Sequence, residues 1–293
     1  MLPLRLITCP DMDQFSTIAS FREYLALRRK QGLKVGFVPT MGALHEGHLD
    51  LVRRSLRENG VTACSIFVNP TQFNNPDDLA NYPRTLAHDV RLLEETGCSV
   101  LFTPAVAEMY PEEEGPPVEV EFGLLDKVME GRFRPGHFRG VVTVVKKFFD
   151  ITEPDRAYFG KKDYQQLAVI RHMVSRLGLP VEIVPCETVR EPDGLAMSSR
   201  NMRLTIAERQ SAPVICRVLR KVKEKVGKVP VSELKEWAVK KMEETPGLRV
   251  EYFEIGDRDT LLPIDRWAHK DRAVAFVAAF LGDVRLIDNL ELF

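Results

Sequence analysis

Short apolar runs alternate with amphipathic stretches through the first two thirds of the chain. Five runs have the length and composition of buried strands, at residues 35–39, 61–68, 99–102, 156–159 and 181–184. Between them, helical periodicity marks residues 48–59, 85–96, 140–151 and 163–177. Alternation of this kind is typical of βαβ units. The pattern therefore predicts an α/β fold, with a Rossmann-like parallel sheet that carries helices on both faces.

The pattern changes after the turn-rich residues 191–194. Two charged helices are expected next, followed by three strands, at residues 205–225, 232–244, 249–255, 273–281 and 284–290. This order indicates a smaller C-terminal α+β domain that closes over the first. We place the boundary near residue 187, which gives a first domain at residues 1–186 and a second at residues 187–293.

Composition narrows the function classes. The 293 residues are 44% hydrophobic and 28% charged, with a formal net charge of −1 and a pI near 6.6, so no overall basic field favours nucleic acid. The most apolar run, residues 273–281, is shorter than the roughly 20 residues of a membrane helix, and the N-terminus lacks signal-peptide features. The basic stretch at residues 217–228 is interpreted as a solvated helix face rather than a polyanion site.

Five scattered cysteines form no C-x-x-C pair, at Cys9, Cys64, Cys98, Cys186 and Cys216. This pattern favours reduced, buried thiols in a cytoplasmic protein over disulfides or a zinc site.

The strongest chemical signal is the segment PTMGALHEGH at residues 39–48, which follows a predicted strand and opens a predicted helix. Such crossings at the carboxyl edge of a parallel sheet bind nucleotides, and a helix start offers N–H groups to phosphate. Gly42 and Gly47 permit close approach of the backbone. His45 and His48 lie three residues apart, so both can donate hydrogen bonds to ATP phosphates.

Three other interpretations of this segment compete. A zinc site is disfavoured because H-E-G-H is not H-E-x-x-H and no third ligand is evident. Two structural histidines at a helix cap would be the default for an isolated His-x-x-His. A dinucleotide or P-loop site is disfavoured because neither glycine-rich fingerprint occurs. The position between strand and helix favours a nucleotidyltransferase.

Four further clusters carry candidate chemistry. Residues 197–200 (MSSR) suit a clamp on a triphosphate, or form a polar turn whose serine caps the helix near Thr205. Residues 160–163 (GKKD) place Lys162 to neutralise phosphate and Asp163 to cap a helix, or form a capped helix with exposed lysines. Gln72 can bond a substrate hydroxyl or carboxylate, or only the backbone of its loop. The basic residues 132–140 bind anions or form a solvated turn.

Taken together, the motifs resemble one family. MGALHEGH, FVNPTQF, NYPRT, RPGHFRGVVTVVKKFF, FGKKDYQQL, GLAMSSRN and RLIDN, in this order, are similar to the pantothenate synthetase family of the H-x-G-H nucleotidyltransferase superfamily. The resemblance covers the chain from about residue 34 to its end. It implies ATP-dependent condensation of pantoate with β-alanine through a pantoyl adenylate, with Mg²⁺ as cofactor, in a cytoplasmic homodimer.

The resemblance also implies roles for individual residues. Catalytic roles fall to His48, His45 and Lys162. The implied ATP-binding residues are Met41, Gly42, Ala43, Leu44, His45, Glu46, Gly47, His48, Gly160, Lys161, Lys162, Asp163, Val189, Met197, Ser198, Ser199 and Arg200. Gln72 is expected to hold pantoate and to lie near β-alanine, and Gln166 is expected to hold pantoate.

The departures from the family pattern are small. Lys161 stands where many members have an acid. Asp89 falls in a region linked to the metal in relatives, but His88 beside it weakens that assignment, so no metal ligand is expected. Two rival functions stay open at this point. One is a superfamily enzyme with another acceptor, which the paired glutamines disfavour. The other is a non-catalytic nucleotide sensor, which would be expected to lack His48, Lys162 or the serine pair.

Overall fold

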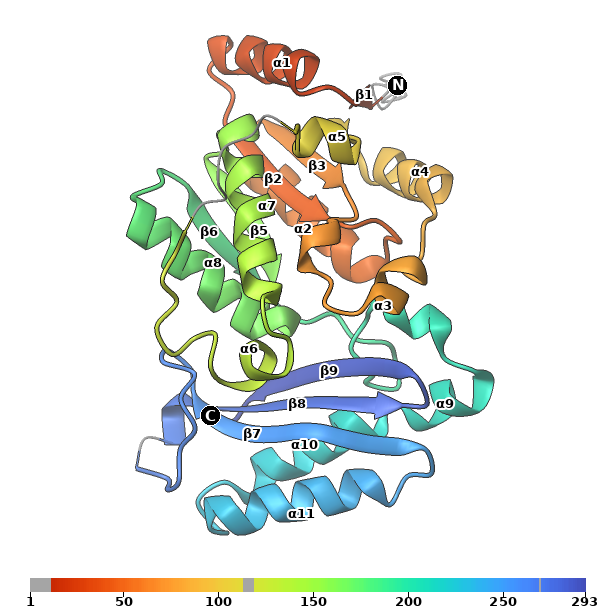
Figure 1. Cartoon of the computed structure of the whole chain (residues 1–293), viewed down its shortest axis with the longest axis vertical. Helices are drawn as coiled ribbons and strands as arrows, with labels where there is room; N and C mark the ends of the chain where they lie inside the picture. The colour runs from red at the N-terminus through yellow and green to blue at the C-terminus, as the bar shows by residue number, and fades with distance from the viewer. Residues whose placement is uncertain (1–11, 113–118, 269) are drawn as a thin grey trace, which may run out of the picture.

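A six-stranded parallel sheet forms the larger part of the molecule (Figure 1). The computed structural model describes residues 12–112, 119–268 and 270–293. The strand order is β1-β4-β3-β2-β5-β6, and every recorded pairing is parallel. The strands are β1 (Asp13–Phe15), β2 (Val35–Thr40), β3 (Val61–Ile66), β4 (Val100–Phe102), β5 (Arg156–Gly160) and β6 (Glu182–Cys186). The order reverses between β2 and β5, which is where open α/β sheets bind ligands.

Helices cover both faces of this sheet, and the strands supply apolar side chains to each. Phe37 belongs to one core with α1 (Ile18–Lys30), α7 (His137–Thr152) and α8 (Tyr164–Leu177). The next residue, Val38, belongs to a second core with α2 (Glu46–Glu58) and α4 (Leu86–Thr96). Alternate residues of a strand point to opposite faces, so continuous apolar runs are needed here. The predicted fold class is confirmed.

Short helices lie on the connections and were absent from the sequence-based prediction, as were β1 and α1. They are η1 (Pro70–Gln72), α3 (Pro76–Ala80), α5 (Val106–Met109), α6 (Met129–Phe133) and η2 (Lys161–Asp163).

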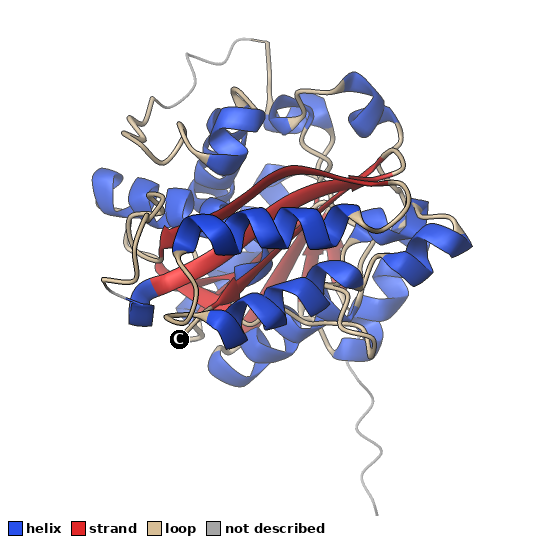
Figure 2. Ribbon diagram, turned by 90° about the horizontal axis from the view of Figure 1, so that it is seen from below, coloured by secondary structure: helices blue, strands red, loops and turns tan. Residues whose placement is uncertain are grey.

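A three-stranded antiparallel sheet follows in the chain, in the order β7-β8-β9. Its core holds side chains from two helices that lie across one face of the sheet, as seen from below in Figure 2. The elements of this part are η3 (Ser199–Arg203), α9 (Ile206–Ser211), α10 (Val214–Lys225), α11 (Val231–Glu243), β7 (Leu248–Asp257), η4 (Lys270–Arg272), β8 (Ala273–Leu281) and β9 (Val284–Glu291).

The single helix predicted over residues 205–225 is wrong. The structure has two helices there, α9 and α10, and they separate at Ala212 and Pro213. Proline lacks the N–H that would continue the ladder of α9, and its ring clashes with the preceding turn.

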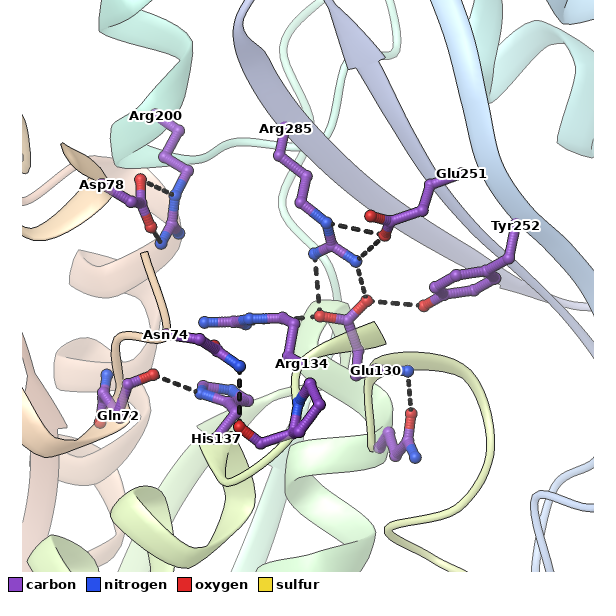
Figure 3. Close-up of polar contacts among 12 residues, drawn as sticks. Gln72, Asn74, Asp78, Glu130, Arg134, His137, Arg200, Glu251, Tyr252 and Arg285 are labelled. Atoms are coloured by element: carbon purple, nitrogen blue, oxygen red, sulfur yellow. Dashed lines mark hydrogen bonds and ion pairs between the residues drawn. The ribbon is translucent and has the colours of Figure 1, made fainter. Parts of the chain in front are cut away.

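An ionic cluster around the buried Glu130 connects α6 with the antiparallel sheet (Figure 3). Arg285 on β9 donates to both oxygens of Glu130 on α6, at 2.9 and 2.7 Å, and also pairs with Glu251. Tyr252 donates to Glu130 at 2.8 Å, and Arg134 lies 3.4 Å from the same carboxylate. Burial alone would raise the pKa of Glu130, but hydrogen bonds and charge from Arg285 outweigh it and hold that pKa at about 2.

Candidate active site

A cleft of about 210 Å³ opens at the switch point of the sheet, at the carboxyl ends of β2 and β5. Most of the residues singled out from the sequence line it. They are Met41, His45, Gly47, His48, Gln72, Gly160, Lys162, Asp163, Gln166, Val189, Met197, Ser198, Ser199 and Arg200. Five proposed ATP-binding residues do not line the cleft, namely Gly42, Ala43, Leu44, Glu46 and Lys161. The cleft therefore gathers all three predicted ATP segments and both predicted pantoate glutamines.

His45 and His48 cap the first turn of α2 with their own rings. Nδ1 of His45 accepts from the Gly47 N–H at 3.1 Å, and Nδ1 of His48 accepts from the His45 N–H at 3.3 Å. The ring centroids are 4.0 Å apart. A neutral imidazole whose Nδ1 accepts carries its proton on Nε2. Both rings therefore have an Nε2–H donor left for a ligand.

Both histidines are neutral at physiological pH. Burial, followed by the charge of Lys162, lowers the pKa of His45 to about 4. Burial, followed by His45 and then Lys162, holds the pKa of His48 well below its usual value. The two rings thus act on an anion as hydrogen-bond donors rather than as cations.

The loop before α2 is held by Asp89, a fully buried residue of α4. Its carboxylate accepts from the N–H groups of Ala43 and Leu44, both at 2.9 Å, and from the Thr85 hydroxyl at 3.0 Å. The oxygens of Asp89 thus bond the loop and Thr85. The N–H groups of residues 43 and 44 face this carboxylate, and the ATP-binding role expected of Ala43 and Leu44 stays a prediction.

Gly47 is required by the ring of His45. A Cβ at position 47 would lie 2.8 Å from Cε1 and 2.9 Å from Nδ1 of that ring. Any larger residue would push His45 off its cap, so the glycine keeps the two imidazoles in contact at the helix start.

The two lysines of the second predicted ATP segment have different surroundings. Lys162 lines the cleft, and its ammonium makes no ion pair or hydrogen bond within the described residues. Lys161 does not line the cleft, and its Nζ lies 2.6 Å from Glu187, at the edge of the cleft, and 3.5 Å from Glu291. Asp163 stands at the N-cap position of α8 but makes no side-chain cap bond, so its predicted capping role is wrong.

Gln72 sits on a loop that is pressed against α7. Its Nε2 lies 2.7 Å from Sδ of Met41, and its Oε1 accepts from Asn69 at 3.3 Å. Asn69 is buried and also donates to the Gly140 carbonyl at 3.2 Å. A Cβ on Gly140 would lie 2.3 Å from the carbonyl oxygen of Thr71, so this close approach needs glycine.

The two neighbouring glutamines of α8 have different surroundings. Gln165 is buried, donates to the carbonyls of Leu125 and Val128 at 2.6 and 2.9 Å, and accepts from Glu130 N–H at 3.0 Å. Gln166 lines the cleft, and its side chain has no hydrogen bond within the described ranges. The structure thus distinguishes a structural glutamine from one that is available to a ligand.

The third ATP segment closes the cleft from the C-terminal side. The buried Ser199 hydroxyl donates to the Ala43 carbonyl at 2.9 Å, and Ser198 caps η3. Arg200 lines the cleft but pairs with Asp78 of α3 at 2.7 Å (Figure 3). The helix α9 is capped by Thr205 itself, with Glu208 completing a capping box. Neither serine is therefore the cap of that helix.

The basic segment at residues 132–140 is partly solvated and partly packed: Arg132 and Arg139 are exposed, whereas two other side chains have protein partners. Arg134 lies against Glu130, and the buried His137 has its Nδ1 2.8 Å from the carbonyl of Gln72 (Figure 3). Tyr82 and Asn69, which line the cleft, were not singled out from the sequence. Their signal was present in the family motifs NYPRT and FVNPTQF.

Two absences concern the parts of the chain that the structure describes. Within residues 12–112, 119–268 and 270–293, no group of three or more His, Cys, Asp or Glu side chains could hold a metal ion. Over the same ranges, no helix has the length and apolarity needed to cross a membrane. Four cysteines are free and buried, as expected, and Cys9 lies outside the described residues.

Comparison with known proteins decides the family. The family model for pantoate–β-alanine ligase matches residues 13–291. The chain belongs to this family. A pantothenate synthetase of Bacteroides thetaiotaomicron is 51% identical over 96% of this chain and 99% of its own, and one of Porphyromonas gingivalis is 48% identical over the same shares.

Solved structures agree. A pantothenate synthetase of Thermus thermophilus has a TM-score of 0.90 at 47% identity, covering 96% of this chain and all of its own. The pantoate–β-alanine ligase of Francisella tularensis, a complex with β,γ-ATP and β-alanine, has a TM-score of 0.79 at 35% identity, over 96% and 98% of the two chains. The chain is therefore an enzyme, an ATP-using ligase of pantoate and β-alanine.

Proposed function

We propose that this ligase works in two steps through an enzyme-bound pantoyl adenylate. In the first step a carboxylate oxygen of pantoate attacks the α-phosphorus of ATP, the bond to the β-phosphate oxygen breaks, and pyrophosphate leaves. In the second, the β-alanine nitrogen attacks the acyl carbon, the acyl–oxygen bond to AMP breaks, and the nitrogen loses a proton. The observation that carries this proposal is the single cleft that gathers the ATP segments and both glutamines.

The cleft would offer the ATP phosphates two cations, Lys162 and Arg200, and the neutral donors of two histidines. Nε2–H of His45 and His48 would meet the phosphorane as its charge develops, because preorganised donors act most strongly on charge that forms in the transition state. Lys162 would supply the positive charge, since its ammonium has no competing partner in the described residues. Arg200 would exchange Asp78 for phosphate oxygens, which it can bind bidentately.

The other half of the cleft suits a short, branched hydroxy acid. Gln72 and Gln166 would bond the polar groups of pantoate, and Gln72 would also lie near β-alanine. Val141, Val144 and Phe148 of α7 line the cleft and would pack against the methyl groups of pantoate. A site of this shape disfavours a phosphorylated acceptor.

Mg²⁺, the dimer and domain closure belong to the same proposal. Since the described residues hold no cluster of metal ligands, Mg²⁺ would enter with the ATP phosphates and neutralise their charge there. We propose a division at residues 186 and 187, with the second domain closing over the cleft, in a cytoplasmic homodimer. Light scattering of the purified protein measures the oligomeric state.

The decisive experiment is to measure AMP and pyrophosphate release while one component at a time is omitted. We expect steady release only with ATP, Mg²⁺, pantoate and β-alanine together, and pyrophosphate exchange into ATP with pantoate alone. Equal turnover without β-alanine would point to a hydrolase or another acceptor. ATP binding without any turnover would favour a nucleotide sensor. Gln72→Ala should weaken the use of pantoate while calorimetry shows intact ATP binding.

A further inference from the structure

The last strand of the C-terminal sheet reaches the loop that carries Lys162. Nδ2 of Asn289, on β9, donates to the carbonyl of Lys161 at 2.9 Å and to the carbonyl of Lys162 at 2.8 Å. Asn289 is buried. Both N–H groups of one amide are therefore used to hold two consecutive carbonyls of η2.

These two bonds fix the direction of the lysines. In a 3₁₀ turn, successive side chains diverge by about 120°, so the orientation of the backbone decides which lysine enters the cleft. Lys161 is held outward by Glu187 and by Glu291, a neighbour of Asn289 on β9. Lys162 then faces the cleft, with no partner of its own in the described residues. The orientation of the Lys162 side chain therefore depends on the backbone of η2, which Asn289 holds.

Asn289 is itself held in place from the other side. Arg190 donates to both oxygens of Asp288, at 2.6 and 2.9 Å, and to the carbonyl of Asn289 at 3.2 Å. Arg190 follows Val189, which lines the cleft. The backbone of Asn289 is thus held before any ligand arrives, and its side-chain amide connects the C-terminal sheet to the segment of Lys161 and Lys162.

We propose that Asn289 is a positioning residue for Lys162. A residue of the C-terminal sheet would thus orient the ammonium group that meets the ATP phosphates. The proposal rests on the role given to Lys162 in the proposed function. A four-carbon side chain amplifies small rotations of its backbone, and an ammonium attracts phosphate only over a short distance in a solvated cleft. Asn289 would not touch ATP and would act only through the loop.

The test compares Asn289→Ala and Asn289→Asp with wild type by pyrophosphate exchange and by calorimetry with ATP. We expect kcat/KM for ATP to fall about tenfold in Asn289→Ala, as two hydrogen bonds are lost, with KM for pantoate nearly unchanged. Asn289→Asp keeps the side-chain shape but turns an oxygen toward two carbonyls, so the loss should be larger. A matched control is Asn74→Ala, which removes a side-chain bond to the Pro135 carbonyl, because neither Asn74 nor Pro135 lines the cleft.

The decisive readout is the double variant with Lys162→Ala. If Asn289 acts through Lys162, Asn289→Ala should change the ATP parameters less than twofold in that background. Two results would overturn the proposal: an equal fall in kcat/KM for ATP with and without Lys162, or an unchanged kcat/KM for ATP in Asn289→Ala. Thermal unfolding is measured first, and if the alanine variant does not fold, Asn289→Asp decides. If the wild type binds ATP but makes no adenylate, the proposed function fails. The ATP affinities of the variants, measured by calorimetry, still test whether Asn289 positions Lys162.

Discussion

Two helices on opposite faces of the sheet, α2 and α8, begin at the same cleft and are built in opposite ways. At the start of α2, protein groups already pair with the backbone: Asp89 takes two N–H groups and the rings of His45 and His48 take two more. At the start of α8, Asp163 makes no cap bond and Lys162 has no partner within the described residues. In the proposed function, the start of α2 is complete before ATP arrives, and the start of α8 is completed by ATP.

The two helix starts suit two different requirements of a reaction between anions, namely stabilising the charge that develops on phosphorus and attracting the triphosphate. A rigid, neutral donor pair costs little reorganisation when charge develops on phosphorus, whereas a single unpaired cation draws in a triphosphate. If both starts carried unpaired cations, their mutual repulsion and burial would be costly. The variants below test this division, in order of decreasing expected effect.

His48→Ala should have the largest effect. We expect pyrophosphate exchange with pantoate to fall about a hundred- to a thousandfold, because a preorganised donor is lost where charge develops. Capture of supplied pantoyl adenylate by β-alanine should change much less. A matched control is His172→Ala, whose ring bonds the Glu121 carbonyl outside the cleft. Equal failure in both half-reactions would instead assign His48 to a common step such as closure.

Lys162→Ala should lose roughly ten- to a hundredfold in kcat/KM for ATP, because a charge-assisted contact to phosphate is worth about 1.5–3 kcal/mol. Lys161→Ala is its control on the same turn and should be mild, since Lys161 pairs outward with Glu187. Steady-state kinetics at saturating pantoate measures both. A greater sensitivity at Lys161 would contradict the orientation of the loop.

Gln166→Ala and Gln165→Ala should affect different quantities. Loss of Gln166 should raise KM for pantoate about tenfold, the size of one hydrogen bond of about 1.4 kcal/mol, with little change in stability. Loss of Gln165 removes three bonds to buried backbone groups and should lower the free energy of unfolding by about 1–3 kcal/mol. Denaturant unfolding and pantoate kinetics on both variants check this, and the reverse pattern would exchange the two roles.

The sequence predicted this site unevenly, for physical reasons. The alternation of strands and helices located both helix starts, because apolar periodicity reports burial directly. The motifs supplied the residues of the cleft, but not the partners of those residues. Asp89, Asp78 and Asn289 act across 46, 122 and 127 positions of the chain. Contacts at such separations depend on tertiary packing, which local patterns do not contain.

The missed elements have a similar cause. Helix α1 buries only Phe21 and Leu25 among its 13 residues, too few to produce a strong period. The break between α9 and α10 had a visible signal in Pro213, which the predicted helix ran through. Asp163 occupies the expected position without the expected bond, because occupying an N-cap position does not fix the side-chain rotamer.

The smallest expected effect is electrostatic coupling between the two helix starts. Lys162 contributes to the lowered pKa of His45, about 4, but burial is the larger cause. Lys162→Met should therefore raise the pKa of His45 only part of the way toward 6.5, which NMR titration of the imidazole Cε1–H would measure. Lys161→Met is the control, since Lys161 does not line the cleft and its charge is not among the causes of the lowered pKa of His45.

The lowered pKa of His45 should also change how the free energy of unfolding depends on pH. His45 has a folded-state pKa below its unfolded value of about 6.5, so between about pH 4 and 6.5 the unfolded chain binds more protons, and stability rises with pH. The stability that neutral His45 allows is thus present above pH 6.5 and is lost as the pH falls toward 4. Lys162→Met should lessen this loss, because a higher folded-state pKa narrows the window. If His45 titrates near 6.5 in wild type, the start of α2 is not the neutral donor pair that the comparison requires.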